Sequence, residues 1–412
     1  MSLKLILYSA ITIFFNGAVL RRYLKDELLL TGPYTLLILL PTITQPICQL
    51  IFGGFCGITL FAIASYRIYQ RLPQRFIDTD GKYVFISGCD SGFGFAIAKA
   101  LDEKGVHVFA GCYLKGQEGE QNLVKACSDR LVTIQLDVTS EESITNAVKT
   151  VQEKLQGKDL WALVNNAGIM YLGEAEIVAM TIYKRVMAVN HYGVVLLTQA
   201  FLPLLRRSKG RIVTMSSTGS EIAFPMLSAY CASKAACKSF MDALRLEMMK
   251  WDVSVSTIHP SGYATNLIHK ETWEQNITEI LNAVKPGLLE EYGPNYKACY
   301  MKKASPLSLP SDLTPVVTAV DHALLAKSPL PQYIVGLSAE IHMLLAAWLP
   351  IGVSKYLVGV FLLSKSSISK VKNSSSDKPE TPKRAVSAES GKLQDEEKIK
   401  EEVETPSEGN AN

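Results

Sequence analysis

The chain has 412 residues, of which 48% are hydrophobic and 20% are charged, and its formal net charge is only +3. This length exceeds one minimal domain and supplies enough apolar residues for a full core. The balance of 42 basic and 39 acidic side chains creates no long-range field, which excludes nucleic acid as a partner. The eight cysteines contain no CxxC pair, so we expect no metal site and no disulfide framework.

The N-terminal region is strongly apolar. Residues 28–66 form a run of 39 without a charged side chain, whereas one helical pass needs about 20 residues. Gln45-Pro46 divides this run, because proline removes a backbone donor, and residues 5–20 form a further apolar stretch. We therefore predict a membrane anchor over residues 1–72 with three transmembrane helices. A cleaved signal peptide is the alternative, but further apolar stretches follow the first one.

Basic residues flank the apolar stretches and predict an orientation. With three passes, both basic clusters lie on the same side, which the positive-inside tendency makes cytoplasmic; they are Arg21, Arg22 and Lys25, and Arg67, Arg71 and Arg75. The catalytic domain is then cytosolic. Asn276 and Asn373 begin glycosylation-type sequences, which only a lumenal location would use.

Strand-like and helix-like segments alternate after Pro73. Six short apolar runs occupy residues 83–87, 106–112, 131–136, 160–164, 211–215 and 253–258. Such strands between amphipathic helices predict an α/β fold, a Rossmann-type doubly wound parallel sheet. We place this catalytic domain at residues 80–336.

The remaining segments have different compositions. Residues 261–310 are irregular and rich in prolines, and we expect a substrate lid there. Residues 337–363 are apolar, and either lie on a membrane or close the domain. Residues 364–412 are almost free of large apolar side chains, which predicts a disordered polar tail.

A glycine-rich loop follows the first predicted strand and opens a helix. Its GxxxGxG spacing allows the backbone to turn tightly and to approach a pyrophosphate at the positive end of the helix. An ordinary glycine-rich turn is the alternative, but ligands in such sheets bind at the carboxyl ends of the strands. The residues of this loop that we assign to the cofactor are Gly88, Asp90, Ser91, Gly92, Phe93 and Gly94.

Two features bear on the choice of cofactor. Asp90 would repel the 2′-phosphate of NADP, so we favour NAD, although Lys115 lies nearby in the sequence and the second strand ends without an acidic residue. Asp137 after the third strand is placed to border the adenine half, or else to cap the next helix. Asn166, Ala167 and Gly168 after the fourth strand complete this region.

Tyr230 and Lys234 are four residues apart, which on a helix places them one turn from each other on the same face. An ammonium favours the phenolate of a neighbouring tyrosine, which could then exchange a proton with an alcohol. Ser217, at the end of a strand, could hold the same substrate oxygen as Tyr230. A tyrosine above a solvated lysine on a helix surface is the alternative for this pair alone.

These motifs together resemble the short-chain dehydrogenase/reductase family over residues 81–336. The resemblance implies that Asn190 joins the serine, tyrosine and lysine in catalysis, and that Lys234 also holds the nicotinamide ribose. It further implies cofactor contacts from Pro260, Gly262 and Thr265, although a serine separates Pro260 from Gly262 here.

Further segments resemble the hydroxysteroid and retinol dehydrogenase branch of this family; they are residues 201–210, 311–317, 322–329 and 349–352. That resemblance implies NAD-dependent oxidation of a lipophilic steroid, the 17β-hydroxyl of estradiol or testosterone, at the endoplasmic reticulum membrane, by a multi-pass protein whose family is commonly dimeric. An 11β-hydroxysteroid or retinol dehydrogenase is the alternative. A catalytically silent membrane scaffold belongs to another class, and the intact Ser217, Tyr230 and Lys234 argue against it.

Overall fold

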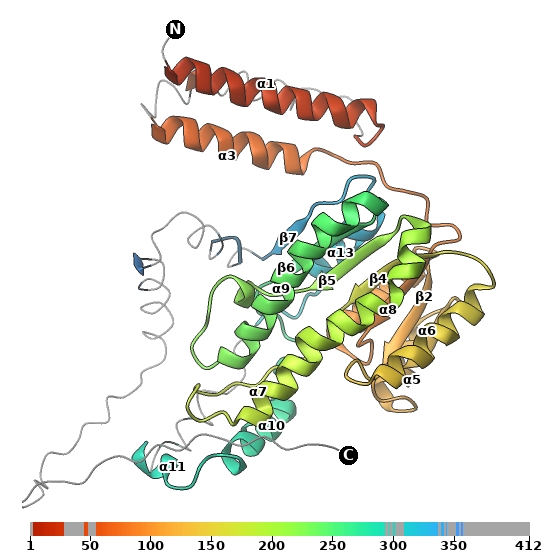
Figure 1. Cartoon of the computed structure of the whole chain (residues 1–412), viewed down its shortest axis with the longest axis vertical. Helices are drawn as coiled ribbons and strands as arrows, with labels where there is room; N and C mark the ends of the chain where they lie inside the picture. Colours follow the sequence, from red (N-terminus) through yellow and green to blue (C-terminus); the bar gives the residue numbers. More distant parts are fainter. Residues whose placement is uncertain are drawn as a thin grey trace, which may run out of the picture. The chain divides into compact units, whose positions relative to one another are not determined.

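A parallel β-sheet with helices on both faces forms the centre of the molecule (Figure 1). The computed structural model describes residues 3–28, 45–47, 55–292, 296, 300, 309–336, 339–341, 343, 352–353 and 356. Its seven strands lie in the order β3-β2-β1-β4-β5-β6-β7, and every neighbouring pair is parallel. The chain reverses its direction of travel across the sheet between β1 and β4, where ligands bind in such folds. The predicted doubly wound fold is confirmed.

The strands agree closely with the predicted apolar runs. They are β1 (Tyr83–Ser87), β2 (His107–Cys112), β3 (Leu131–Gln135), β4 (Leu160–Asn165), β5 (Arg211–Met215), β6 (Ser254–Pro260) and β7 (Gln332–Val335). All residues of β1 and β5 are buried, because helices cover both faces and a continuous apolar run is needed there. The sequence did not predict the short β7, which pairs with β6 at the edge of the sheet.

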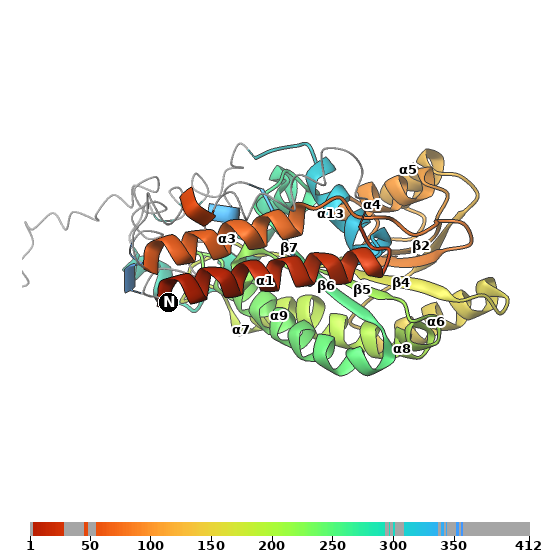
Figure 2. The same cartoon turned by 90° about the horizontal axis from the view of Figure 1, so that it is seen from above.

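Two helical layers enclose the sheet, as Figure 2 shows. One layer contains α4 (Gly92–Glu103), α5 (Glu118–Ala126) and α13 (Thr314–Leu325), and the other contains α6 (Glu141–Leu155), α8 (Gly193–Ser208) and α9 (Ser228–Met248). The predicted lid region contains α10 (Lys270–Asn282) and α11 (Leu288–Glu291), and α7 (Met180–Met187) precedes α8. Each layer buries its own apolar cluster against the sheet.

The N-terminal helices α1 (Leu3–Leu24) and α3 (Phe55–Arg71) pack against each other, with the rings of Tyr8 and Phe61 5.4 Å apart. Among the described residues, two helical segments are long and apolar enough to span a membrane, Leu3–Leu24 and Met180–Ser208. The second contains α8, which packs in the core, so α1 is the candidate membrane span. The predicted middle pass lies largely outside the described residues, and the tail at residues 364–412 lies wholly outside them. Residues 45–47, where we predicted a division at Pro46, are described and are helical.

Residues 74–77 connect the helix pair to the catalytic domain as an extended segment, which we name the clasp. On one side, the Arg75 amide donates to the Glu27 carbonyl at 3.0 Å. On the other side, the Ile77 amide donates to the Leu325 carbonyl, and the Lys327 amide donates to the Arg75 carbonyl, both at 2.8 Å. Asp26 forms ion pairs of 2.8 Å with both Arg75 and Lys327.

Candidate active site

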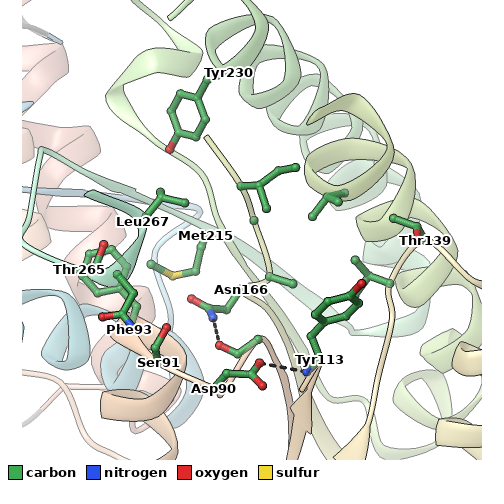
Figure 3. A pocket seen from close by; sticks show the side chains of 18 of the residues that line it. Asp90, Ser91, Phe93, Tyr113, Thr139, Asn166, Met215, Tyr230, Thr265 and Leu267 are labelled. Atoms are coloured by element: carbon green, nitrogen blue, oxygen red, sulfur yellow. Dashed lines mark hydrogen bonds between the residues drawn. The ribbon is translucent and has the colours of Figure 1, made fainter. Parts of the chain in front are cut away.

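A cavity of about 610 Å³ lies at the carboxyl ends of the central strands. Figure 3 shows the glycine loop at one end of this cavity and Tyr230 at the other. The predicted site residues that line it are Gly88, Asp90, Ser91, Gly92, Phe93, Asp137, Asn166, Ala167, Gly168, Tyr230, Lys234 and Thr265. The sequence did not identify the other lining residues, among them Tyr113, Leu136, Val138, Thr139, Ile169, Tyr171, Arg185, Val189, Met215, Ser216, Asn266 and Leu267.

The glycine loop leaves no room for side chains. Gly88 has φ +71°, and a Cβ there would lie 2.9 Å from the Cα of Ala167. A Cβ at Gly94 would lie 2.0 Å from the Gly88 carbonyl oxygen. Gly94 therefore packs behind the loop and permits its tight turn, while Gly88 and Gly92 line the cavity. The backbone is thus free to approach a dinucleotide, and the residues present fit such a cofactor.

Asn166, the residue directly after the neighbouring strand β4, fixes this loop. Its Nδ2 donates to the carbonyl oxygens of Ser87 and Gly88, both at 2.9 Å. The hydroxyl oxygen of Ser87 in turn accepts from the amide of Asn166 at 3.0 Å and that of Ala167 at 3.1 Å. These reciprocal bonds join the two loops that meet at the reversal of strand order.

Asp90 connects the glycine loop to the end of β2. One of its carboxylate oxygens accepts from the Tyr113 amide at 3.0 Å (Figure 3). The other accepts from the Leu114 amide, also at 3.0 Å. The carboxylate therefore lies at the carboxyl end of β2, although it comes from the glycine loop after β1. The sequence alone did not reveal this contact between the two loops.

We expect Asp90→Asn to weaken the preference for NAD over NADP. The substitution removes a negative charge that opposes a 2′-phosphate, so the ratio of kcat/KM values for the two cofactors should fall about tenfold. Steady-state kinetics with each cofactor measure it. Glu118→Gln is the control, because it removes an equal charge from the exposed first turn of α5; an equal fall there would contradict a specific role for Asp90.

Asp137 lies in the cavity wall and does not cap α6. Its carboxylate accepts from the amide of Thr139 at 2.8 Å and from that hydroxyl at 2.7 Å. The N-cap of α6 is Ser140, which accepts from the amide of Ser143 at 3.2 Å. The helix-cap alternative for Asp137 is therefore wrong.

Tyr230 and Lys234 lie one turn apart near the start of α9, as the spacing predicts. The Lys234 ammonium is 5.8 Å from the centre of the Tyr230 ring and donates to the Met215 carbonyl at 2.8 Å. Ser217 begins the turn after β5, and its hydroxyl hydrogen-bonds to the Tyr230 phenol. The structure therefore brings these three side chains together, and two of them, Tyr230 and Lys234, line the end of the cavity.

Burial controls the ionisation of this group. Burial raises the pKa of Tyr230 to about 12, although the hydrogen bond with Ser217 lowers it. Burial also lowers the pKa of Lys234. The sequence predicts that the ammonium favours the phenolate, but the desolvation of both groups has the larger effect on the pKa of Tyr230 here.

Five predicted site residues lie outside the cavity lining; they are Gly94, Asn190, Ser217, Pro260 and Gly262. Asn190, fully buried in a π-helical turn at Ala188–Tyr192, accepts from the Ile169 amide at 2.8 Å and donates to the Ser233 hydroxyl at 3.0 Å. Pro260 ends β6 in the core. A Cβ at Gly262 would face Leu309 at 3.1 Å, and Gly94 packs behind the loop. Thr265 does line the cavity.

Three side chains from separate elements join the lid region to the cavity. Arg185 of α7 donates to the Tyr171 hydroxyl at 2.8 Å and to Glu279 of α10 at 2.6 Å. Tyr171 also donates to Glu279 at 2.8 Å. Both Tyr171 and Arg185 line the cavity. The sequence contained no signal for this triad, because its members are distant in the chain.

Loss of the triad should loosen the lid. We expect Glu279→Gln to raise KM for the substrate about two- to fivefold and to change kcat less, because a half-exposed ion pair contributes up to about 1 kcal/mol. Steady-state kinetics measure both constants. Glu290→Gln on α11 is the control, since this exposed residue carries the same charge; an equal effect there would mean that net charge, and not the triad, matters.

A glycine loop at the reversal of strand order and a tyrosine–lysine pair beside it define a dinucleotide-dependent oxidoreductase. The family model for short chain dehydrogenase matches residues 82–276. The chain belongs to the short-chain dehydrogenase family.

Curated relatives and a solved structure agree with this assignment. The chain is 39% identical to estradiol 17-beta-dehydrogenase 2 of Rattus norvegicus over 77% of its own length and 85% of that protein. It is 38% identical to 17-beta-hydroxysteroid dehydrogenase type 2 of Homo sapiens, over 75% and 81% respectively. A short chain dehydrogenase/reductase from Burkholderia phymatum in complex with NAD matches with a TM-score of 0.53 and 20% identity, over 65% of this chain and 92% of that one. The last similarity concerns the fold alone.

Proposed function

We propose that the protein oxidises the 17β-hydroxyl of a steroid such as estradiol or testosterone to the ketone, with NAD as cofactor. The observation that carries the reaction type is the contact of Ser217 with Tyr230, which together with Lys234 lines one end of the cavity, while the glycine loop lines the other end. The choice of steroid comes from the names of the relatives. Bound NAD supplies the hydride acceptor.

The side chains of the site accept the proton of the alcohol and position the substrate and the cofactor. Tyr230 takes the proton of the alcohol, and Ser217 holds the same oxygen through its hydroxyl. Lys234, fixed by the Met215 carbonyl, holds the ribose of the cofactor and keeps a positive charge near the phenol. Asn190 keeps the backbone of Ile169 and the start of α9 together.

A substrate panel tests this function. Microsomes that contain the protein are incubated with NAD and, separately, estradiol, an 11β-hydroxy glucocorticoid and retinol. We expect estradiol to be oxidised fastest. Turnover of another alcohol with estradiol untouched would replace the steroid proposal by that alternative.

Alcohol oxidation should accelerate as the pH rises. The reaction needs the phenolate, and burial holds the pKa of Tyr230 near 12, so kcat/KM should increase up to about tenfold per pH unit between pH 6 and 9. Reduction of the ketone, which needs the protonated phenol, should not rise in this way. A pH–rate profile that is flat in both directions would contradict the role of Tyr230.

We further propose a three-helix anchor over residues 1–72 in the endoplasmic reticulum membrane, with the dehydrogenase in the cytosol. The apolar helix α1 and the basic residues after it support this proposal. Limited proteolysis of sealed microsomes tests it, because a cytosolic domain is digested from outside. Asn276, whose Nδ2 donates to the Met170 carbonyl at 3.0 Å, should carry no glycan.

A further inference from the structure

His259 is a fully buried histidine on β6, the strand next to the one that ends before Ser217. Its Nδ1 lies 3.2 Å from the Ser217 carbonyl oxygen and 3.1 Å from the Ser220 hydroxyl. Its Nε2 lies 3.0 Å from the Thr257 hydroxyl. Both ring nitrogens are therefore engaged, and one of them contacts the backbone of a reacting-centre residue.

The Ser217 carbonyl oxygen can only accept, so the tautomer that bonds to it carries its proton on Nδ1. In that tautomer Nε2 faces the Thr257 hydroxyl as an acceptor, and this hydroxyl also lies 3.4 Å from the Pro331 carbonyl oxygen, the other group to which it can donate. Burial lowers the pKa of His259 to about 4, so the ring stays neutral in neutral solution. The nearby charged groups, Glu221, Lys238 and Asp242, influence this pKa less than burial does.

The His259 contact reaches Ser217 at the point where the sheet ends. The last ladder bond between the two strands runs from the Ser216 amide to the Ile258 carbonyl at 2.8 Å. Beyond it, the Ser217 carbonyl accepts from the Ser220 amide at 3.0 Å and the Ser220 hydroxyl at 2.7 Å, both within its own turn. The His259 imidazole is the contact to this carbonyl from the adjacent strand.

The orientation of the Ser217 backbone sets the position of its hydroxyl. That hydroxyl accepts from the Gly219 amide at 3.1 Å within the same turn and hydrogen-bonds to the Tyr230 phenol. A turn that rotates about Ser217 would move the hydroxyl away from the phenol. Displacements of about 1 Å can lower rates by about 100-fold when geometry controls the reaction.

We propose that His259 is a positioning residue for alcohol oxidation, which acts by holding the Ser217 carbonyl through its Nδ1–H and so aligns the serine hydroxyl with Tyr230. This proposal rests on the proposed chemistry of Ser217 and Tyr230, but not on the identity of the alcohol. It assigns to the strand before Pro260 a function that the glycine loop and the tyrosine–lysine pair do not reveal.

Two nearly isosteric variants test the proposal in the full-length, membrane-bound enzyme with NAD. The side-chain amide of His259→Asn can donate from near the Nδ1 position, whereas His259→Leu cannot. We expect His259→Leu to lower kcat about 10- to 100-fold, with KM for the alcohol and the dissociation constant of NAD within about twofold, and His259→Asn to recover most of that loss. The control is His322→Leu, which removes a different histidine that is only partly buried. The Nδ1 of His322 is hydrogen-bonded to the Tyr333 hydroxyl at 2.7 Å. We expect this variant to have a lower melting temperature and an unchanged kcat.

Several outcomes would overturn the proposal. They are equal kcat losses in the Asn and Leu variants, a loss confined to KM or to thermal stability, and a loss as large in His322→Leu. The rates are measured with the alcohol that the wild-type enzyme oxidises fastest. A failure to oxidise estradiol would therefore contradict the steroid assignment, while the role of His259 would still be tested with the other alcohol. If no alcohol is oxidised, deuterium exchange at the Gly219 and Ser220 amides tests the proposal instead. We expect faster exchange in His259→Leu, and unchanged exchange would mean that the imidazole does not hold the turn.

Discussion

Replacing Tyr230 by phenylalanine is expected to lower kcat for alcohol oxidation by about 10³-fold, within the 10²- to 10⁴-fold range of general acid–base catalysis. The Tyr230 phenol is the proton acceptor. Ser217 and Lys234 position the phenol and the cofactor, and neither side chain replaces the phenol as the proton acceptor. The dissociation constant of NAD should change little, because the ring itself stays in the cavity wall. Single-turnover measurements with saturating NAD separate the chemical step from product release.

The matched control is Tyr183→Phe on α7. The Tyr183 hydroxyl contacts the Ser228 hydroxyl at 2.5 Å, and its loss removes the same atom from a neighbouring helix. Turnover in this variant should stay within about twofold, since a single peripheral hydrogen bond contributes about 1 kcal/mol or less to stability. Unchanged turnover in Tyr230→Phe itself would revive the hypothesis of a catalytically silent membrane scaffold.

The second large effect is expected from Gly94→Ala, which adds one methyl group behind the glycine loop. That methyl would lie 2.0 Å from the Gly88 carbonyl oxygen and 2.6 Å from the Asn166 Nδ2. Both atoms belong to the hydrogen bonds that join the two loops, so the backbone has to shift. Overpacking of this kind costs about 1–3 kcal/mol, and we expect the dissociation constant of NAD to rise about 10- to 100-fold.

Titration of NAD binding and thermal unfolding together measure this effect. In the control, Gly17→Ala, the same methyl group meets no atom within 4 Å and should leave NAD binding unchanged. Wild-type affinity in Gly94→Ala would show that the loop tolerates a wider turn, and would contradict the tight cradle that we describe.

The central strands could be predicted because their signal is local. Residues 83–87 and 211–215 are continuous apolar or β-favouring runs that are buried on both faces, and their observed bounds match the prediction. β7 escaped prediction because it has four residues and lies between prolines and Gly336. Its formation depends on pairing with β6, which no local pattern encodes.

The candidate site also has one part that local sequence spacing predicts and another part that only the fold brings together. Tyr230 and Lys234 lie within one helical turn, so their spacing in the sequence determines their geometry. The triad of Tyr171, Arg185 and Glu279 unites residues 14 and 94 positions apart along the chain. Only the completed fold brings these three side chains together. The same is true of His259, whose Nδ1 contacts the carbonyl oxygen of Ser217.

The expected effect of lysine on tyrosine was wrong for a physical reason. Sequence spacing gives a distance between Tyr230 and Lys234, but it does not give the polarity of their surroundings. Desolvation acts on both groups at once, raising the pKa of Tyr230 and lowering that of Lys234.

The clasp at residues 74–77 makes the junction between the helix pair and the dehydrogenase a hydrogen-bonded joint. A flexible linker would allow the catalytic domain to rotate relative to the helix pair. A segment that is hydrogen-bonded on both sides instead couples the orientation of the helix pair to the end of α13. In the membrane anchor that we propose, this joint would give the catalytic domain a preferred orientation relative to α1. A soluble fragment that begins at residue 80 would leave the Leu325 carbonyl and the Lys327 amide without these partners. Fragments designed for crystallisation should accordingly keep the clasp.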